Sequence, residues 1–100
     1  MTEPKNIEVP DIVGGAKLIL YVTLENRKAT GRTEHIHIGK TVEPTVGLAI
    51  CKYDNENGYY LFGCNSNWDS VTDTWHETID DAIEQAEWEY EGLSGAWVKK

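Results

Sequence analysis

Apolar residues alternate with other residues along positions 16–24, and this pattern predicts a β-strand. One face of the strand is expected to carry four apolar side chains: Leu18, Leu20, Val22 and Leu24. A polar loop follows and leads into a second predicted strand at residues 32–39. Pairing the two strands around this loop places Ile36 opposite Leu20 and Ile38 opposite Leu18, with His35 and His37 on the outer face.

A second hairpin is predicted from residues 46–52 and 59–64, which flank the turn-forming segment 54–58. Both faces of this hairpin are apolar, so we expect it in the middle of the sheet with cover on both sides. A symmetric hairpin sets Tyr53 opposite Tyr59 and Cys51 opposite Leu61. The thiols of Cys51 and Cys64 then point to opposite faces, and we expect two small buried hydrophobes and no disulfide.

The clearest predicted element is a helix that begins after Thr78 and ends before Gly92. Thr78 followed by Asp81 is a variant of the capping box, and Gly92 is typical of a helix end. The apolar residues of this segment form one stripe at helical spacing: Ile79, Ala82, Ile83, Ala86 and Tyr90. The pattern as a whole predicts an α+β domain, a mostly antiparallel sheet of four to six strands with one long C-terminal helix packed on one face.

The chain of 100 residues has room for one hydrophobic core. Residues 1–15 are expected to form an irregular arm that ends in a Gly14-Gly15 turn, residues 16–98 a single domain, and residues 99–100 a solvated tail. Residues 65–73 are polar and turn-rich and include Trp68. A short extended piece at residues 74–76 precedes the helix, and residues 93–98 predict a short closing strand.

The formal net charge of −8 at pH 7 argues against a protein that binds nucleic acid by neutralising phosphates, and against adhesion to an anionic membrane. No apolar run approaches the roughly 18 residues of a spanning helix, and the first residues lack the apolar core of a secretory signal. The sequence therefore predicts a soluble cytoplasmic protein.

Charge is distributed unevenly along the chain. Residues 53–98 hold eleven Asp and Glu residues and no Lys or Arg, so the negative charge belongs to the second half. Seven of these acids lie on or beside the predicted helix: Glu77, Asp80, Asp81, Glu84, Glu87, Glu89 and Glu91. Like charges at helical spacing destabilise a helix, so this arrangement favours a role for the acids in binding.

Trp88 lies opposite the apolar stripe of the predicted helix, among acidic residues. An aromatic ring surrounded by charge is typical of a partner-binding patch. The candidate binding residues are Trp88, Glu84, Glu87, Glu91, Asp81, Trp68 and Asp69. Two other interpretations stay open: the N-terminal arm or the loop around Trp68 covers the ring, or the acids only keep the protein soluble.

Other chemical signals are weaker. His35 and His37 share one strand face, and His76 could join them as zinc ligands. Asp69 and Asp73 have oxygen ligands for calcium but lack the spacing of a calcium loop. No nucleophile motif and no phosphate-binding glycine loop is present, so we expect a protein that is not an enzyme and needs no cofactor.

The segment from Asp73 through the acidic helix to Gly92 resembles the ending of small bacterial α+β proteins in which a sheet precedes one acidic helix. Among small acidic bacterial proteins of this architecture, the immunity proteins of toxin systems are a familiar functional group. The resemblance implies an inhibitor that binds a basic toxin, and it implies no catalytic residue.

Three functions are thus consistent with the sequence. The preferred one is a non-catalytic module that binds a basic protein partner through the acidic helix. The first alternative is a small-molecule or zinc site on the sheet face of Tyr21, His35 and His37. The second is a homodimer formed through sheet edges or through the face of Trp88.

Overall fold

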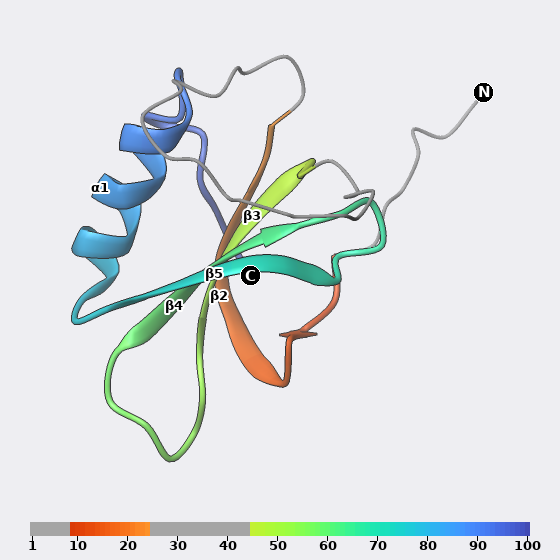
Figure 1. The fold of residues 1–100 in the computed structure, drawn as a ribbon, viewed down its shortest axis with the longest axis vertical. Helices are drawn as coiled ribbons and strands as arrows, with labels where there is room; N and C mark the ends of the chain where they lie inside the picture. The colour runs from red at the N-terminus through yellow and green to blue at the C-terminus, as the bar shows by residue number, and fades with distance from the viewer. Residues whose placement is uncertain (1–8, 25–44) are drawn as a thin grey trace, which may run out of the picture.

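The computed structural model describes residues 9–24 and 45–100. Its elements are β1 (Ile12–Val13), β2 (Ala16–Thr23), β3 (Gly47–Lys52), β4 (Tyr59–Cys64), β5 (Ser70–His76), α1 (Ile79–Glu89) and β6 (Val98–Lys99). The strands form one antiparallel sheet in the order β1-β2-β3-β4-β5. The sheet curls, and α1 lies against one side of it (Figure 1). The α+β fold with an antiparallel sheet agrees with the prediction.

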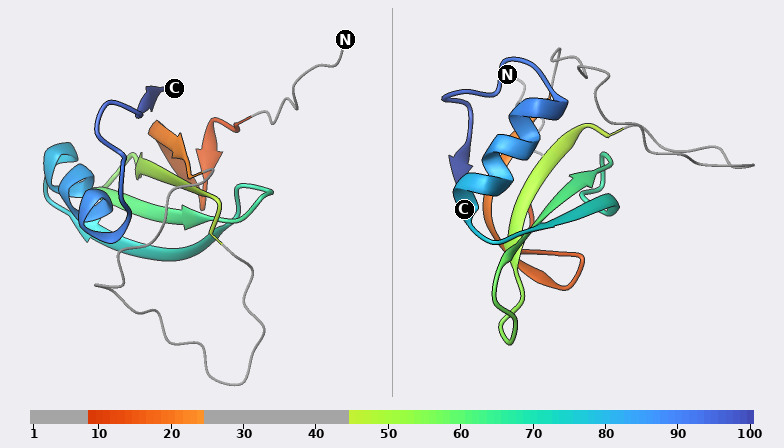
Figure 2. Two further views of the ribbon diagram at one scale, coloured as in Figure 1. Left: turned by 90° about the horizontal axis from the view of Figure 1, so that it is seen from above. Right: turned by 60° about the vertical axis from the view of Figure 1, so that its left-hand side comes forward.

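Two short strands share the outer edge of β2. β1 pairs with β2 at Ala16 and Lys17, and β6 pairs with it further along at Leu20 and Tyr21. The chain reaches β6 after α1 by crossing back over the sheet (Figure 2). Lys100 extends this pairing, because its backbone N–H donates to the carbonyl of Ile19 at 3.0 Å. Residues predicted as an irregular arm and a solvated tail therefore contribute to the sheet.

β2 has a bulge at Ile19, and the predicted single apolar face of this strand is wrong. Leu18 pairs with Cys51 while Leu20 pairs with Ile50, so one extra residue stands in β2 between these pairs. Because neighbouring residues of β3 point to opposite faces, the bulge turns Leu18 to one face and Leu20 to the other. The strand thus supplies apolar side chains to both sides of the sheet.

The predicted pairing of Leu20 with Ile36 is also wrong. Leu20 pairs with Ile50 on one side and with Lys99 on the other, so both edges of β2 are occupied there. Residues 32–39 themselves, including His35 and His37, lie outside the described residues.

The hairpin of β3 and β4 has its strands where they were predicted, but its register differs by one residue. Cys51 pairs with Tyr60, whereas the symmetric hairpin set it opposite Leu61. Tyr53 leaves the ladder because its backbone carbonyl accepts from the N–H of Glu56 in the turn. The hydroxyl of Tyr53 also donates to the carbonyl of Gly14 at 2.5 Å, which ties the turn between β1 and β2 to the end of β3.

The register places Cys51 and Cys64 on the same face of the sheet, which corrects the expectation of opposite faces. They stand four residues apart along the ladder, about 13 Å at the rise of a strand, which is too far for a disulfide. Both thiols are buried, and the Sγ of Cys64 lies 3.9 Å from the carbonyl of Phe62. The prediction of small buried hydrophobes is confirmed.

Burial on both faces of β3 gives the molecule two hydrophobic clusters. The first cluster consists of Val13, Ala16, Leu18, Ala49, Cys51, Phe62, Cys64 and Trp68. The second cluster lies between the sheet and α1 and consists of Val22, Leu24, Leu48, Ile50, Leu61, Ala82, Ala86 and Leu93. Ile79, Ile83 and Tyr90 pack against the second cluster, so the predicted apolar stripe of the helix is confirmed.

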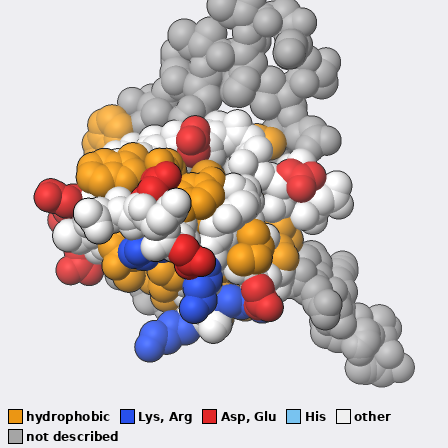
Figure 3. Space-filling model, turned by 90° about the horizontal axis from the view of Figure 1, so that it is seen from below, with side chains coloured by type: hydrophobic (Ala, Val, Ile, Leu, Met, Phe, Trp, Pro, Cys, Tyr) orange, Lys and Arg blue, Asp and Glu red, His pale blue; other side chains and the backbone are white. Residues whose placement is uncertain are grey.

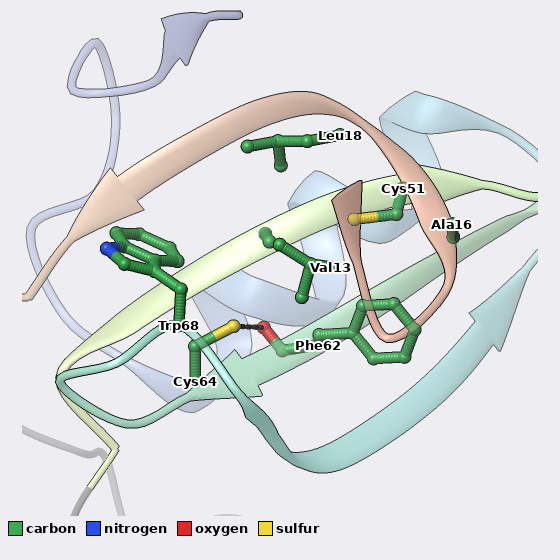
Figure 4. Close-up of a cluster of buried hydrophobic side chains, with 8 residues drawn as sticks. Val13, Ala16, Leu18, Cys51, Phe62, Cys64 and Trp68 are labelled. Atoms are coloured by element: carbon green, nitrogen blue, oxygen red, sulfur yellow. Dashed lines mark hydrogen bonds between the residues drawn. The ribbon is translucent and has the colours of Figure 1, made fainter. Parts of the chain in front are cut away.

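Trp68 closes one end of the first cluster (Figure 4). It stands in a tight loop in which the Oδ1 of Asn65 accepts from the N–H groups of Asn67 and Asp69. The backbone of Trp68 has a φ of 63°, a left-handed conformation that is uncommon for a bulky residue. The ring lies directly over Gly47, where an added Cβ would come within 2.7 Å of it. Position 47 of β3 therefore requires glycine, which has no side chain.

We predict that Gly47→Ala destabilises the fold by about 1–3 kcal/mol, because the new methyl group must displace the indole of Trp68. In a Trp68→Leu background the same substitution should cost much less, since the displaced ring is absent. Urea unfolding followed by circular dichroism measures both costs. Equal costs in the two backgrounds would show that the ring is not the obstacle.

Candidate partner-binding groove

A shallow groove of about 500 Å³ lies where the end of β5 meets α1. Two tryptophans, three carboxylates, one histidine and one amide line it: Trp75, Trp88, Glu77, Asp81, Glu84, His76 and Gln85. No Lys or Arg is among these residues. The groove therefore combines aromatic surface with negative charge.

One stripe of α1 forms the helical wall of the groove. Asp81, Glu84, Gln85 and Trp88 recur at helical spacing on the side of the helix that faces away from the second cluster. The start of the stripe is fixed by Thr78, whose hydroxyl oxygen accepts from the N–H of Asp81 at 3.0 Å. This bond was predicted from the sequence, and it sets the rotation at which the acids emerge from the helix.

Trp75 forms the other wall and is held by the turn between β3 and β4. Its Nε1 donates to the carbonyl of Asn57 at 3.4 Å, and its ring lies over Gly58, where an added Cβ would meet the indole. Even so, 52% of Trp75 is exposed, and 45% of Trp88. Two large aromatic side chains thus present surface to one groove, which is unusual for tryptophan in a folded protein.

The carboxylates of the groove are exposed, and no described lysine lies within salt-bridge distance of Glu77, Asp81 or Glu84. The four lysines of residues 9–24 and 45–100 lie on β2, on β3 and at β6: Lys17, Lys52, Lys99 and Lys100. On the surface seen from below, lysines gather in one part, and hydrophobic side chains flanked by carboxylates lie in another (Figure 3). The groove thus lacks lysine, whereas elsewhere on the surface Lys100 forms a salt bridge with Asp11 at 3.2 Å.

His76 is the titratable base of the groove. Burial lowers its pKa from the ordinary value, and the carboxylates of Asp81 and Glu89 oppose that shift because they favour the imidazolium. The Nε2 of His76 lies 2.7 Å from the hydroxyl oxygen of Thr74. Burial therefore favours the neutral form of the imidazole.

The structure brings together only part of the predicted binding set. Trp88, Asp81 and Glu84 line the groove, whereas Glu87 and Glu91 do not. Trp68 does not belong to a surface patch, because it is 6% exposed and packs in the first cluster. Its neighbour Asp69 is exposed on that loop, outside the groove.

The structure answers one part of the interpretation that Trp88 is covered by another segment. Trp68 was a candidate cover for Trp88, but its ring packs edge to face with Tyr21 at a centroid distance of 5.9 Å in the first cluster. It therefore does not cover the outer face of α1. Residues 1–8 of the predicted arm lie outside the described residues.

Sequence reasoning missed Trp75 and Gln85. It counted Glu77 only among the acids beside the helix and considered His76 only as a metal ligand. The helical spacing from Asp81 through Glu84 and Gln85 to Trp88 was a signal for the helical wall. Nothing in the sequence joins Trp75 to that wall, because the contact depends on how β5 leads into α1.

The other chemical candidates find less support among the described residues. Burial raises the pKa of both Cys51 and Cys64 to about 12, which makes these thiols poor nucleophiles. Within residues 9–24 and 45–100, no group of three or more His, Cys, Asp and Glu side chains could hold a metal ion. Tyr21, proposed to line a site with His35 and His37, packs edge to face against Trp68, and both histidines lie outside the described residues.

We predict that the imidazole of His76 titrates below the ordinary histidine pKa of about 6.5. Asp81→Asn should lower this pKa further, because it removes a carboxylate that favours the charged form. NMR titration of the imidazole protons measures both values, with the His76 signal identified by its loss in His76→Gln. Asp69→Asn, remote from the groove, is the control and should leave the pKa unchanged.

The same shift affects the free energy of unfolding. A histidine whose pKa is lower in the folded state binds a proton more readily when the protein is unfolded. The folded state therefore has its full stability with respect to this group above about pH 6.5, and it loses stability as the pH falls below that value. His76→Gln should therefore reduce the decline of stability below that pH. A decline of equal size in both proteins would contradict the lowered pKa.

Among the described residues, no helix has the length and apolar character needed to cross a membrane. Comparison of the chain with protein-family models, with curated proteins and with solved structures finds no significant match. The function proposed below therefore depends on the residues of this chain alone.

Proposed function

We propose that the protein is a non-catalytic binding module that takes a lysine- or arginine-rich segment of a partner protein into the groove between β5 and α1. The observation that carries this proposal is the composition of the groove. Two half-exposed indoles and three exposed carboxylates line one surface that contains no Lys or Arg.

The residue types of the groove complement a cationic side chain in two ways. A Lys or Arg placed over an exposed indole gains a cation–π interaction of about 0.5–1 kcal/mol. The same cation then lies within reach of Asp81 or Glu84, which stand on the same helical stripe as Trp88. A neutral or anionic segment gains neither contribution, so the groove discriminates by charge.

The charge of the whole chain supports the same partner. The net charge of −8 attracts a basic protein over a distance and speeds association, and this attraction weakens with added salt. In the immunity-type form of the proposal, the partner is a toxin nuclease. The module then blocks it by covering the basic surface that receives phosphates.

We predict that Glu84→Lys weakens binding of a fluorescein-labelled peptide of ten lysines by about tenfold, because it removes an attraction and adds a repulsion inside the groove. Fluorescence anisotropy at near-physiological salt measures the affinity. Trp88→Ala should weaken binding by about two- to fivefold through the lost cation–π interaction.

Glu87→Lys is the matched control for Glu84→Lys. It makes the same change of net charge on the same helix, but Glu87 does not line the groove. Its effect should be only about two- to threefold, since its side chain does not line the groove and acts on the peptide through water, where an interaction between charges is weak. Equal losses in the two variants would show a general attraction to the acidic protein and would contradict a binding groove.

A further inference from the structure

The two ends of the sheet differ in how their edges are covered. At one end, β1 and β6 together pair with the outer side of β2. At the other end is β5, and in the described residues no strand pairs with its outer side. An edge strand presents a row of backbone N–H and C=O groups to which a further strand can bind. β5 is thus the accessible edge of the described sheet.

The groove runs across this edge. Trp75 pairs with Tyr60, which packs against the first cluster, whereas His76 pairs with Tyr59, which packs against the second. The side chains of Trp75 and His76 therefore lie on opposite faces of the sheet, yet both line the groove. A groove lined from both faces of one strand passes over the backbone edge of that strand.

The features that usually protect an edge strand are few in β5. The strand contains neither Lys nor Pro, and its bulge lies at Val71, near its start. From Thr72 to His76 the ladder with β4 is regular. Most of the accessible edge is therefore in the conformation that another strand needs for pairing.

We propose that an extended basic segment of the partner adds to the sheet as a strand alongside β5 between Thr72 and His76. This inference rests on the function proposed above and states how the basic segment binds. Alternate side chains of an added strand point to opposite faces. The side chains of the added strand that point toward α1 meet Asp81 and Glu84, and those that point to the other face meet Trp75. The segment therefore carries Lys or Arg at every second position.

A second copy of this chain is a poorer occupant of the edge. Asp73 lies in the middle of β5, and Glu77 directly follows the strand. Pairing two β5 strands brings two sets of these carboxylates to one interface, and like charges across paired strands are destabilising. Charge complementarity therefore favours a basic strand.

The experiment uses a ten-residue peptide in which lysine and threonine alternate, and two modified forms of it. In one form the backbone nitrogens of the lysines are methylated, and in the other those of the threonines. The acidic side of the groove fixes which side chains face α1, and the direction of the peptide along β5 then decides which set of N–H groups faces β5. A peptide bound in one direction uses only that set. Strand addition predicts that one form loses about tenfold or more in affinity, as expected for one or two lost hydrogen bonds, and that the other keeps it.

Hydrogen exchange of the β5 amides gives a second readout. The unmodified peptide should slow exchange at alternate residues of β5, whereas binding through side chains alone should not. Equal affinity of the two methylated forms, without slower exchange, would overturn strand addition and leave the proposed function standing. Failure of every peptide to bind would overturn both. A dimer that already protects the β5 amides without peptide would assign the edge to a second copy and overturn the basic strand.

Discussion

The fold depends on the burial of β3 on both of its faces. Its central residues Leu48, Ala49, Ile50 and Cys51 are at most 2% exposed, although alternate ones point in opposite directions. A sheet with two apolar faces must be covered twice. The chain meets this requirement with α1 on one side and with the turn after β1 and the loop of Trp68 on the other.

The bulge at Ile19 allows the single strand β2 to contribute apolar side chains to both faces of the sheet. Before the bulge, Leu18 contributes to the first cluster, and after it Val22 contributes to the second. The change of partner on the outer edge of β2, from β1 to β6, occurs at the same place. Bulges increase the local twist of a strand, which agrees with the curled form of the sheet.

This arrangement determines which surfaces of the described elements remain accessible. Both sheet faces are used for the core, and the outer edge of β2 is paired, so the outer side of α1 and the edge of β5 remain accessible among the described elements. The groove lies where these two surfaces meet. Trp75 and Trp88 are the exposed aromatic side chains of that groove.

Local signals were sufficient to predict α1 and the strands of the central hairpin. Thr78, the apolar stripe and Gly92 act within a few residues of each other, so their effect is visible in the sequence. The hairpin register was not predictable in this way. It depends on whether Tyr53 belongs to the strand or to the turn, and a bond from its hydroxyl to the distant Gly14 contributes to that outcome.

The same limit applies to the tryptophans. The sequence placed Trp88 correctly on the outer side of the helix, because helical spacing alone determines that side. Trp68 is among the predicted binding residues, whereas the structure buries it. Its burial follows from a left-handed backbone conformation and from the space above Gly47, and both are properties of the folded chain.

The acidic helix is stable in this position because the core holds it. Neighbouring carboxylates such as Glu84 and Glu87 destabilise a helix by about 0.2–0.5 kcal/mol for each pair, and a helix of 11 residues is marginal by itself. Ala82 and Ala86 are fully buried against the sheet, so packing and not the outer side chains determines that α1 forms. The outer face can therefore keep an unfavourable concentration of negative charge, and binding of the proposed basic partner would relieve that repulsion.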